Sequence, residues 1–231
     1  MASANANGLD STSIVIAWAV RPWDSMPPSK FHTLFSDIGG VLATNGWDTA
    51  LRQRVATHFG VQLAEIEGRH QLTFDSYERG FMTFEHYLQR VFFASPRDFK
   101  LEDVRDYVYS QSVAWPENIS FFHRVKLASH VKFGLISNEG EGITEHRLRK
   151  FGLREVADFM VISHFVHFRK PDPEIWKLAL NLANARPEES IYIDDREMFA
   201  DVASGLGFTA IHHTSLETTS TRLRELGLAV E

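Results

Sequence analysis

Polar residues that a plain hydrophobic core would not need stand beside apolar runs at four places along this chain. The four segments are Ser36-Asp37-Ile38-Gly39-Gly40, Ser137-Asn138, Arg169-Lys170-Pro171-Asp172 and Asp194-Asp195. Carboxylates are oxygen ligands of the kind that Mg²⁺ prefers, and a lysine beside them can neutralise an anionic group. Taken singly, each segment is weak, because an Asp after a strand is usually a turn former and Lys-Pro-Asp-Pro usually starts a helix. Their meaning depends on the elements that bring them together.

Five short, β-prone runs are predicted to form strands, and they alternate with helical patterns in the second half of the chain. The predicted strands are Phe31–Ser36, Lys132–Ile136, Phe159–Ile162, Ser190–Ile193 and Thr209–His212. A helix is predicted over Glu174–Ala183, where apolar residues recur on one face. This alternation predicts an α/β fold with a Rossmann-like parallel sheet flanked by helices. The carboxyl ends of parallel strands meet at one edge of the sheet, so the polar segments are expected to gather there.

The spacing predicts a helical insertion after the first strand. About ninety-five residues separate the first predicted strand from the second, far more than one crossover needs. Helical spacing of apolar residues occurs over Thr49–Phe59, Thr83–Phe93 and Leu101–Ser110. We therefore expect a helical cap at residues 45–113, a core formed by residues 26–44 and 114–231, and a helix over Glu117–Ser129 that returns to the core. Residues 1–25, rich in Ala, Asn and Ser, are expected to be an extension outside the fold.

Composition excludes several classes of function. The chain has 231 residues, with 24 Lys+Arg against 30 Asp+Glu and a formal net charge of −6, which argues against a nucleic-acid partner. It has no cysteine, which excludes disulfides, thiolate catalysis and Cys-based zinc sites and fits the expectation of a cytoplasmic protein. No apolar run approaches the roughly 18 residues that span a bilayer, so no membrane partner is expected. The sequence leaves the oligomeric state open.

In this order, the four segments resemble the motifs of the haloacid dehalogenase (HAD) superfamily, over roughly Phe31 to His213. The resemblance implies that Asp37 is a nucleophile that forms an aspartyl-phosphate, that Ser137 hydrogen-bonds the phosphoryl group and that Lys170 neutralises charge. The implied substrate-binding residues are Gly39, Gly40 and Asn138. The implied ligands of Mg²⁺ are the Asp37 carboxylate, the Gly39 carbonyl, Asp195 and Asp194, with Asp195 favoured over Asp194. The implied activity is Mg²⁺-dependent hydrolysis of a small phosphorylated metabolite.

Two positions depart from the family pattern. Most phosphatases of the family have an Asp general acid–base two residues after the nucleophile, where this chain has Gly39. General acid–base catalysis is worth roughly 10²–10⁴-fold, so its absence matters. In the fourth motif, relatives often have Asp or Asn where this chain has Phe199, and whether Asp201 compensates is left open by the sequence.

The Asp-x-Gly-Gly opening, Ser-Asn and Asp-Asp resemble one branch in particular, the α-D-glucose-1-phosphate phosphatase-like enzymes with a small helical cap. An anomeric hydroxyl leaves with less need of a proton, so the resemblance implies a preference for sugar 1-phosphates. Two alternatives remain: a catalytically impaired phosphate-binding protein, and a metal-independent dehalogenase. Four residues are candidates for cap or rim contacts, although surface charges and core aromatics are the commoner explanation: Trp47, Tyr77, Arg79 and His86.

Overall fold

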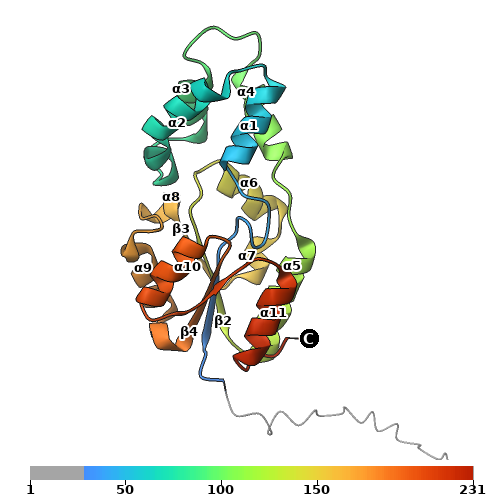
Figure 1. Cartoon of the computed structure of the whole chain (residues 1–231), viewed down its shortest axis with the longest axis vertical. Coiled ribbons are helices and arrows are strands. Elements are labelled where there is room, and N and C mark those ends of the chain that lie inside the picture. The colour runs from blue at the N-terminus through green and yellow to red at the C-terminus, as the bar shows by residue number, and fades with distance from the viewer. Residues whose placement is uncertain (1–28, 231) are drawn as a thin grey trace, which may run out of the picture.

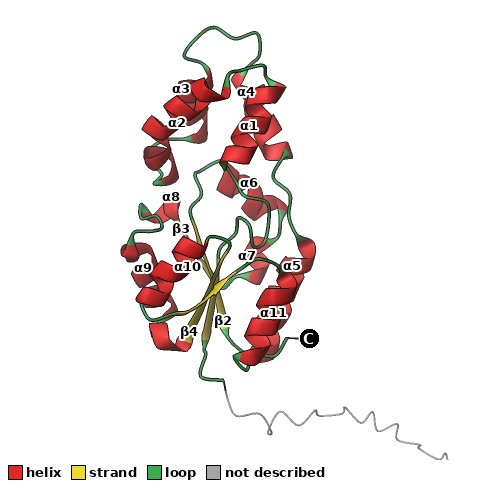
Figure 2. Ribbon diagram, viewed as in Figure 1, coloured by secondary structure: helices red, strands yellow, loops and turns green. Residues whose placement is uncertain are grey.

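The computed structural model describes residues 29–230, so the predicted extension at residues 1–25 lies outside the described residues. Five parallel strands form one sheet in the order β3-β2-β1-β4-β5. Figure 2 shows the strands in yellow with helices on both sides of them. The strands are β1 (Thr33–Ser36), β2 (Lys132–Ser137), β3 (Phe159–Ile162), β4 (Ser190–Asp194) and β5 (Thr209–His212). All five were predicted, the first beginning two residues later than expected, and the predicted α/β class is confirmed.

Helices cover both faces of the sheet, and the alternation of buried side chains explains why. Leu34 of β1 joins the core on one face and Phe35 joins the core on the other, since successive strand residues point to opposite sides. The first face packs against α5, α7 and α11, and the second against α9 and α10 (Figure 1). The helices outside the insertion are α5 (Pro116–Ser129), α6 (Ile143–Lys150), α7 (Leu153–Val156), α8 (Ser163–Val166), α9 (Pro173–Ala183), α10 (Glu197–Gly205) and α11 (Leu216–Glu225), with a short 3₁₀ helix η2 (Pro187–Glu189).

Four of the five helices between β1 and β2 form a separate layer beyond one end of the sheet (Figure 1). They are α1 (Thr49–His58), α2 (Leu63–Glu78), α3 (Phe84–Phe92) and α4 (Leu101–Ser110). Their apolar faces build a core of their own around Phe84, Tyr87 and Phe92, and Ile143 of α6 joins it from the rest of the molecule. Among residues 29–230, no helix is long and apolar enough to cross a membrane.

Helix α2 is the one element of the insertion that the apolar spacing did not predict. Of the residues that it buries, only Ile66 is aliphatic, and the other two are His70 and Tyr77. Their polar atoms lower the apparent amphipathicity of the segment, although both rings are buried. The helix matters to the site described next, because its last turn lies over the carboxyl edge of the sheet.

Candidate active site

The pairing of β1 with β4 brings the predicted carboxylates together. Ser36 stands opposite Ile193 in the parallel register, and the Asp37 amide donates to the Ile193 carbonyl at 2.9 Å. Asp37, Asp194 and Asp195 therefore leave the same edge of two adjacent strands, and one carboxylate oxygen from each lies within 4.8 Å of the others.

Lys170 lies at the centre of this group and is fully buried. Its Nζ is 3.0 Å from Asp37 Oδ2 and 2.6 Å from Asp194 Oδ2. The amide of Asn138 fixes the lysine backbone from both sides, donating to the Lys170 carbonyl at 2.8 Å and accepting from the Lys170 amide at 2.7 Å. Asn138 thus holds the lysine in register with β2, and its predicted contact with substrate stays a prediction.

Burial and charge act in opposite directions on these groups. Burial raises the pKa of Asp37 to about 7, although the charge of Lys170 and a hydrogen bond from Ser137 both lower it. Burial alone would lower the pKa of Lys170, but the charges of Asp194 and Asp37 raise it above its ordinary value. The lysine is therefore held as a cation beside a carboxyl group that is costly to ionise, and a further cation at this edge would favour the ionised form of Asp37.

The two acidic residues at the end of β4 differ in how much of their bonding capacity the protein uses. Asp194 accepts from Lys170, from the Tyr192 hydroxyl and, through Oδ1, from the Arg196 amide at 2.9 Å. Asp195 accepts from Asn45 through Oδ2, while its buried Oδ1 has no hydrogen-bond partner among residues 29–230. A buried carboxylate oxygen without a donor is costly unless a ligand satisfies it. The donor set fits a hard divalent cation bound by Asp37 and Asp195, with Asp194 fixing Lys170.

The backbone conformation at position 40 requires glycine. Its φ of +68° lies in the left-handed region, and a Cβ there would be 2.1 Å from Asp195 Oδ2. The predicted role of Gly40 in binding substrate stays a prediction, whereas its close approach to the Asp195 carboxylate is direct.

A cavity of about 80 Å³ lies between Asp37 and Lys170 on one side and the insertion on the other. The predicted residues Gly40, Asp194 and Asp195 are not among those that line it. The predicted residues that line it are Asp37, Gly39, Ser137, Asn138 and Lys170, and from the insertion Trp47 and Tyr77. Arg79 instead donates to the His167 carbonyl at 3.3 Å, and His86 is exposed on α3. Phe199 lines the cavity, with its ring centroid 5.0 Å from Lys170 Nζ, whereas Asp201 is exposed and does not line it.

Several cavity residues were missed by the sequence analysis. Arg169 lines the cavity and forms an ion pair with Glu78 at the end of α2, with Nη2 2.6 Å from Oε2. This ion pair joins the insertion to the segment that carries Lys170. Arg196 and Asn45 line the cavity as well. Arg169 was visible in the sequence directly before Lys170. Its partner, Glu78, lies in α2, the helix that apolar spacing did not predict.

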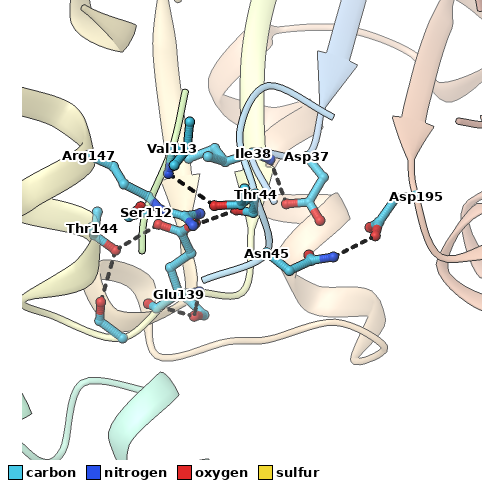
Figure 3. Close-up of polar contacts among 12 residues, drawn as sticks. Asp37, Ile38, Thr44, Asn45, Ser112, Val113, Glu139, Thr144, Arg147 and Asp195 are labelled. Atoms are coloured by element: carbon cyan, nitrogen blue, oxygen red, sulfur yellow. Dashed lines mark hydrogen bonds and ion pairs between the residues drawn. The ribbon is translucent and has the colours of Figure 1, made fainter. Parts of the chain in front are cut away.

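A buried ion pair borders the cavity where the chain enters and leaves the insertion, and its acidic member, Glu139, is one of the lining residues (Figure 3). Arg147 and Glu139 are in direct contact, and their side chains are 0% and 4% exposed. The same guanidinium donates to the Thr44 carbonyl at 2.5 Å and to Ser112 Oγ at 2.8 Å. Arg147 therefore connects the loop after β2 to both chain crossings between the sheet and the insertion.

A family model described as "Haloacid dehalogenase-like hydrolase" matches residues 52–210. The chain belongs to this family and is a HAD-like hydrolase. The resemblance that the motifs indicated is confirmed at the level of the superfamily.

Individual relatives are more distant. The chain is 24% identical over 197 residues to flavin mononucleotide hydrolase 1 of Arabidopsis thaliana, covering 82% of this chain and 78% of that protein. It is 29% identical over 85 residues to the phosphorylated carbohydrates phosphatase of Thermotoga maritima, covering 37% of this chain and 39% of that protein.

Solved structures share the fold. A HAD family enzyme from Bacteroides thetaiotaomicron superposes with a TM-score of 0.72 at 21% identity, covering 84% of this chain and 98% of that chain. The structure of the same enzyme in complex with magnesium and inorganic phosphate superposes with a TM-score of 0.66 at 22% identity, covering 78% of this chain and 93% of that chain.

Proposed function

We propose that this protein is a Mg²⁺-dependent phosphatase that hydrolyses a small phosphorylated metabolite through an aspartyl-phosphate on Asp37. The observation that carries the proposal is the buried grouping of Asp37 and Lys170 beside Asp195, whose Oδ1 has no hydrogen-bond partner among residues 29–230. The relatives named as a flavin mononucleotide hydrolase and a phosphorylated carbohydrates phosphatase support it, as does the structural neighbour crystallised with magnesium and phosphate.

Asp37, Asp195 and the Gly39 carbonyl would hold the cation, which lowers the repulsion between an anionic phosphoryl group and a carboxylate. A carboxylate oxygen of Asp37 forms a bond to phosphorus as the bond from phosphorus to the leaving oxygen breaks. Lys170 neutralises part of the charge on the nucleophile and the phosphoryl oxygens, and Ser137 donates to the phosphoryl group. Water then cleaves the aspartyl-phosphate, which returns Asp37 and releases inorganic phosphate.

Position 39 provides no proton to the leaving oxygen, because glycine has no side chain. Such a site favours a substrate whose leaving oxygen can depart without being protonated first. We propose a sugar 1-phosphate as the preferred substrate, since an anomeric oxygen leaves more readily than a primary alkoxide.

The direct test is release of p-nitrophenol from p-nitrophenyl phosphate in Mg²⁺ and in EDTA. The nitrophenolate leaving group needs no proton, so the assay reports on nucleophile and cation without the question of Gly39. Activity in Mg²⁺ that EDTA abolishes is the expected result, followed by faster hydrolysis of glucose 1-phosphate than of glucose 6-phosphate. Phosphate-dependent binding without turnover would replace the proposal with the phosphate-binding alternative.

Tyr77 gives a prediction about substrate contact from the insertion. Its side chain is buried, it lines the cavity, and its hydroxyl has no hydrogen-bond partner in the described part of the chain. Burial raises the pKa of Tyr77 well above its ordinary value, so the phenol stays protonated and can donate.

Tyr77→Phe should therefore raise KM for the preferred substrate several-fold while leaving the melting temperature unchanged or higher, because it removes an unsatisfied buried group. Steady-state kinetics and thermal unfolding of both proteins check this. An unchanged KM for every phosphate ester that the enzyme turns over would mean that the hydroxyl does not contact substrate.

A further inference from the structure

Asn45 occupies an unusual place between the two motifs that carry the carboxylates. It is the first residue of the predicted insertion, and Figure 3 shows its side chain directed across the site toward Asp195. Its Nδ2 donates to Asp195 Oδ2 at 3.1 Å. The other oxygen of Asp195, Oδ1, is buried and has no hydrogen-bond partner in the described part of the chain.

The residue before Asn45 is held firmly, which fixes the starting point of the Asn45 side chain. The Thr44 amide donates to the Val113 carbonyl at 2.9 Å, and the Val113 amide donates to the Thr44 hydroxyl at 3.1 Å. Arg147 donates to the Thr44 carbonyl. The segments that enter and leave the insertion are thus hydrogen-bonded to each other at Thr44, and Asn45 is the next residue along the chain.

The Asn45 amide also lies where a side chain at position 39 would project. A Cβ built on Gly39 would be 2.8 Å from Asn45 Oδ1, closer than such atoms approach in real structures. Gly39 is not among the described glycines with positive φ, so its backbone would accept an L-residue. Asn45 Oδ1 is the end of a movable side chain, and the crowding can be relieved if that amide turns away from Asp195.

We propose that Asn45 is a positioning residue that orients Asp195 for the cation, and that this hydrogen bond and a side chain at position 39 exclude each other. The inference rests on the proposed Mg²⁺-dependent function. The inference explains why position 39 is glycine. The absence of a side chain there leaves space for the Asn45 amide, which orients the Asp195 carboxylate toward the cation. The inference also predicts that an acid at position 39 would disturb cation binding before it could assist the leaving group.

The test is a double-mutant cycle on Mg²⁺ affinity, measured by isothermal titration calorimetry with MgCl₂ on wild type, Asn45→Ala, Gly39→Ala and the double variant. Gly39→Ala keeps the backbone carbonyl. Loss of a group that orients a metal ligand typically costs 10–100-fold, so each single variant should bind Mg²⁺ at least about tenfold more weakly. The double variant should lose no more than either single one, because both remove the same hydrogen bond.

Activity toward p-nitrophenyl phosphate gives a second readout. The half-saturating Mg²⁺ concentration should rise in all three variants, and their deficit should shrink at high Mg²⁺. Asn181→Ala, on the exposed end of α9, and Gly68→Ala, where a Cβ meets nothing within 4 Å, are matched controls that should bind Mg²⁺ as wild type does.

Wild-type affinity in Asn45→Ala or in Gly39→Ala would overturn the inference, as would losses that multiply in the double variant. Those outcomes leave the proposed function intact, because wild type would still bind Mg²⁺ and turn over substrate. If wild type shows neither Mg²⁺ binding nor Mg²⁺-dependent hydrolysis, the proposed function fails and this inference fails with it.

Discussion

Asp37→Asn should reduce hydrolysis of p-nitrophenyl phosphate by roughly 10⁴-fold or more, since an amide of the same shape cannot attack phosphorus. The same chemical change at the exposed Asp201, which does not line the cavity, is the matched control and should keep wild-type kcat/KM. Activity of Asp37→Asn within tenfold of wild type would assign the nucleophile to another residue. A large loss in Asp201→Asn would show that this residue reaches the reaction after all.

The same variant should be more stable than wild type when cation is removed, and the gain should depend on pH. The pKa of Asp37 is about 7 when folded, against an ordinary value of 3.8. The folded protein therefore binds more protons between these values, and the free energy of unfolding of wild type falls as the pH rises from about 4 to 7. Asp37→Asn lacks this cost, while Lys170 keeps its ion pair with Asp194.

We expect a gain of about 1–4 kcal/mol at pH 8 and a smaller one at pH 5, corresponding to ~2–4 °C in melting temperature per kcal/mol. Thermal unfolding in EDTA at the two pH values checks this. An equal or larger gain at pH 5 would contradict the pKa of Asp37. Adding Mg²⁺ should stabilise wild type more than Asp37→Asn, because the cation binds the ionised carboxylate.

Arg147→Met should destabilise the protein by about 3–5 kcal/mol, among the largest effects of a single substitution. The change leaves Glu139 buried without its partner and removes the donors to Thr44 and Ser112. A drop of roughly 10 °C in melting temperature is expected. Arg222→Met, where an exposed Arg pairs with Glu225, is the control and should change stability by less than about 0.5 kcal/mol.

Adding Glu139→Gln to Arg147→Met should restore part of the loss, because the buried group is then neutral. Urea unfolding of wild type, Arg147→Met, Arg147→Met with Glu139→Gln, and Arg222→Met measures the free energy of unfolding of each. If Arg147→Met were as stable as Arg222→Met, the buried pair would contribute nothing and the chain crossings would be held by their backbone hydrogen bonds alone.

The strands and the groups at their ends were predictable because each is local. An apolar run of four to six residues followed by Asp or Ser is visible in the sequence. The parallel topology then brings the ends of these strands to the same edge of the sheet. The helix α2 was not predictable from apolar spacing, because two of its three buried residues, His70 and Tyr77, carry polar atoms. Its absence from the prediction also hid the ion pair between Glu78 and Arg169.

The contacts of Asn45 were beyond the sequence for a different reason. Asn45 and Asp195 lie far apart in the chain, and an Asn followed by Gly46 reads as a turn. Only the parallel pairing of β1 with β4 brings the two side chains to 3.1 Å. The departure at Gly39 was visible, but its physical partner was not.

The place of β1 in the sheet has a consequence for how the chain assembles during its synthesis. Thr33 of this central strand pairs with Lys132 on one side and with Ser190 on the other, so both neighbours are made long after it. Contacts of such sequence separation slow folding and leave apolar edges exposed in the meantime. Helices α1 to α4 make mostly local contacts and can form first. Leu34 and Phe35 of β1 stay unburied until β2 and β4 have been synthesised. We expect refolding from denaturant to show early helix formation, and the nascent chain to be most prone to aggregation until β4 has emerged.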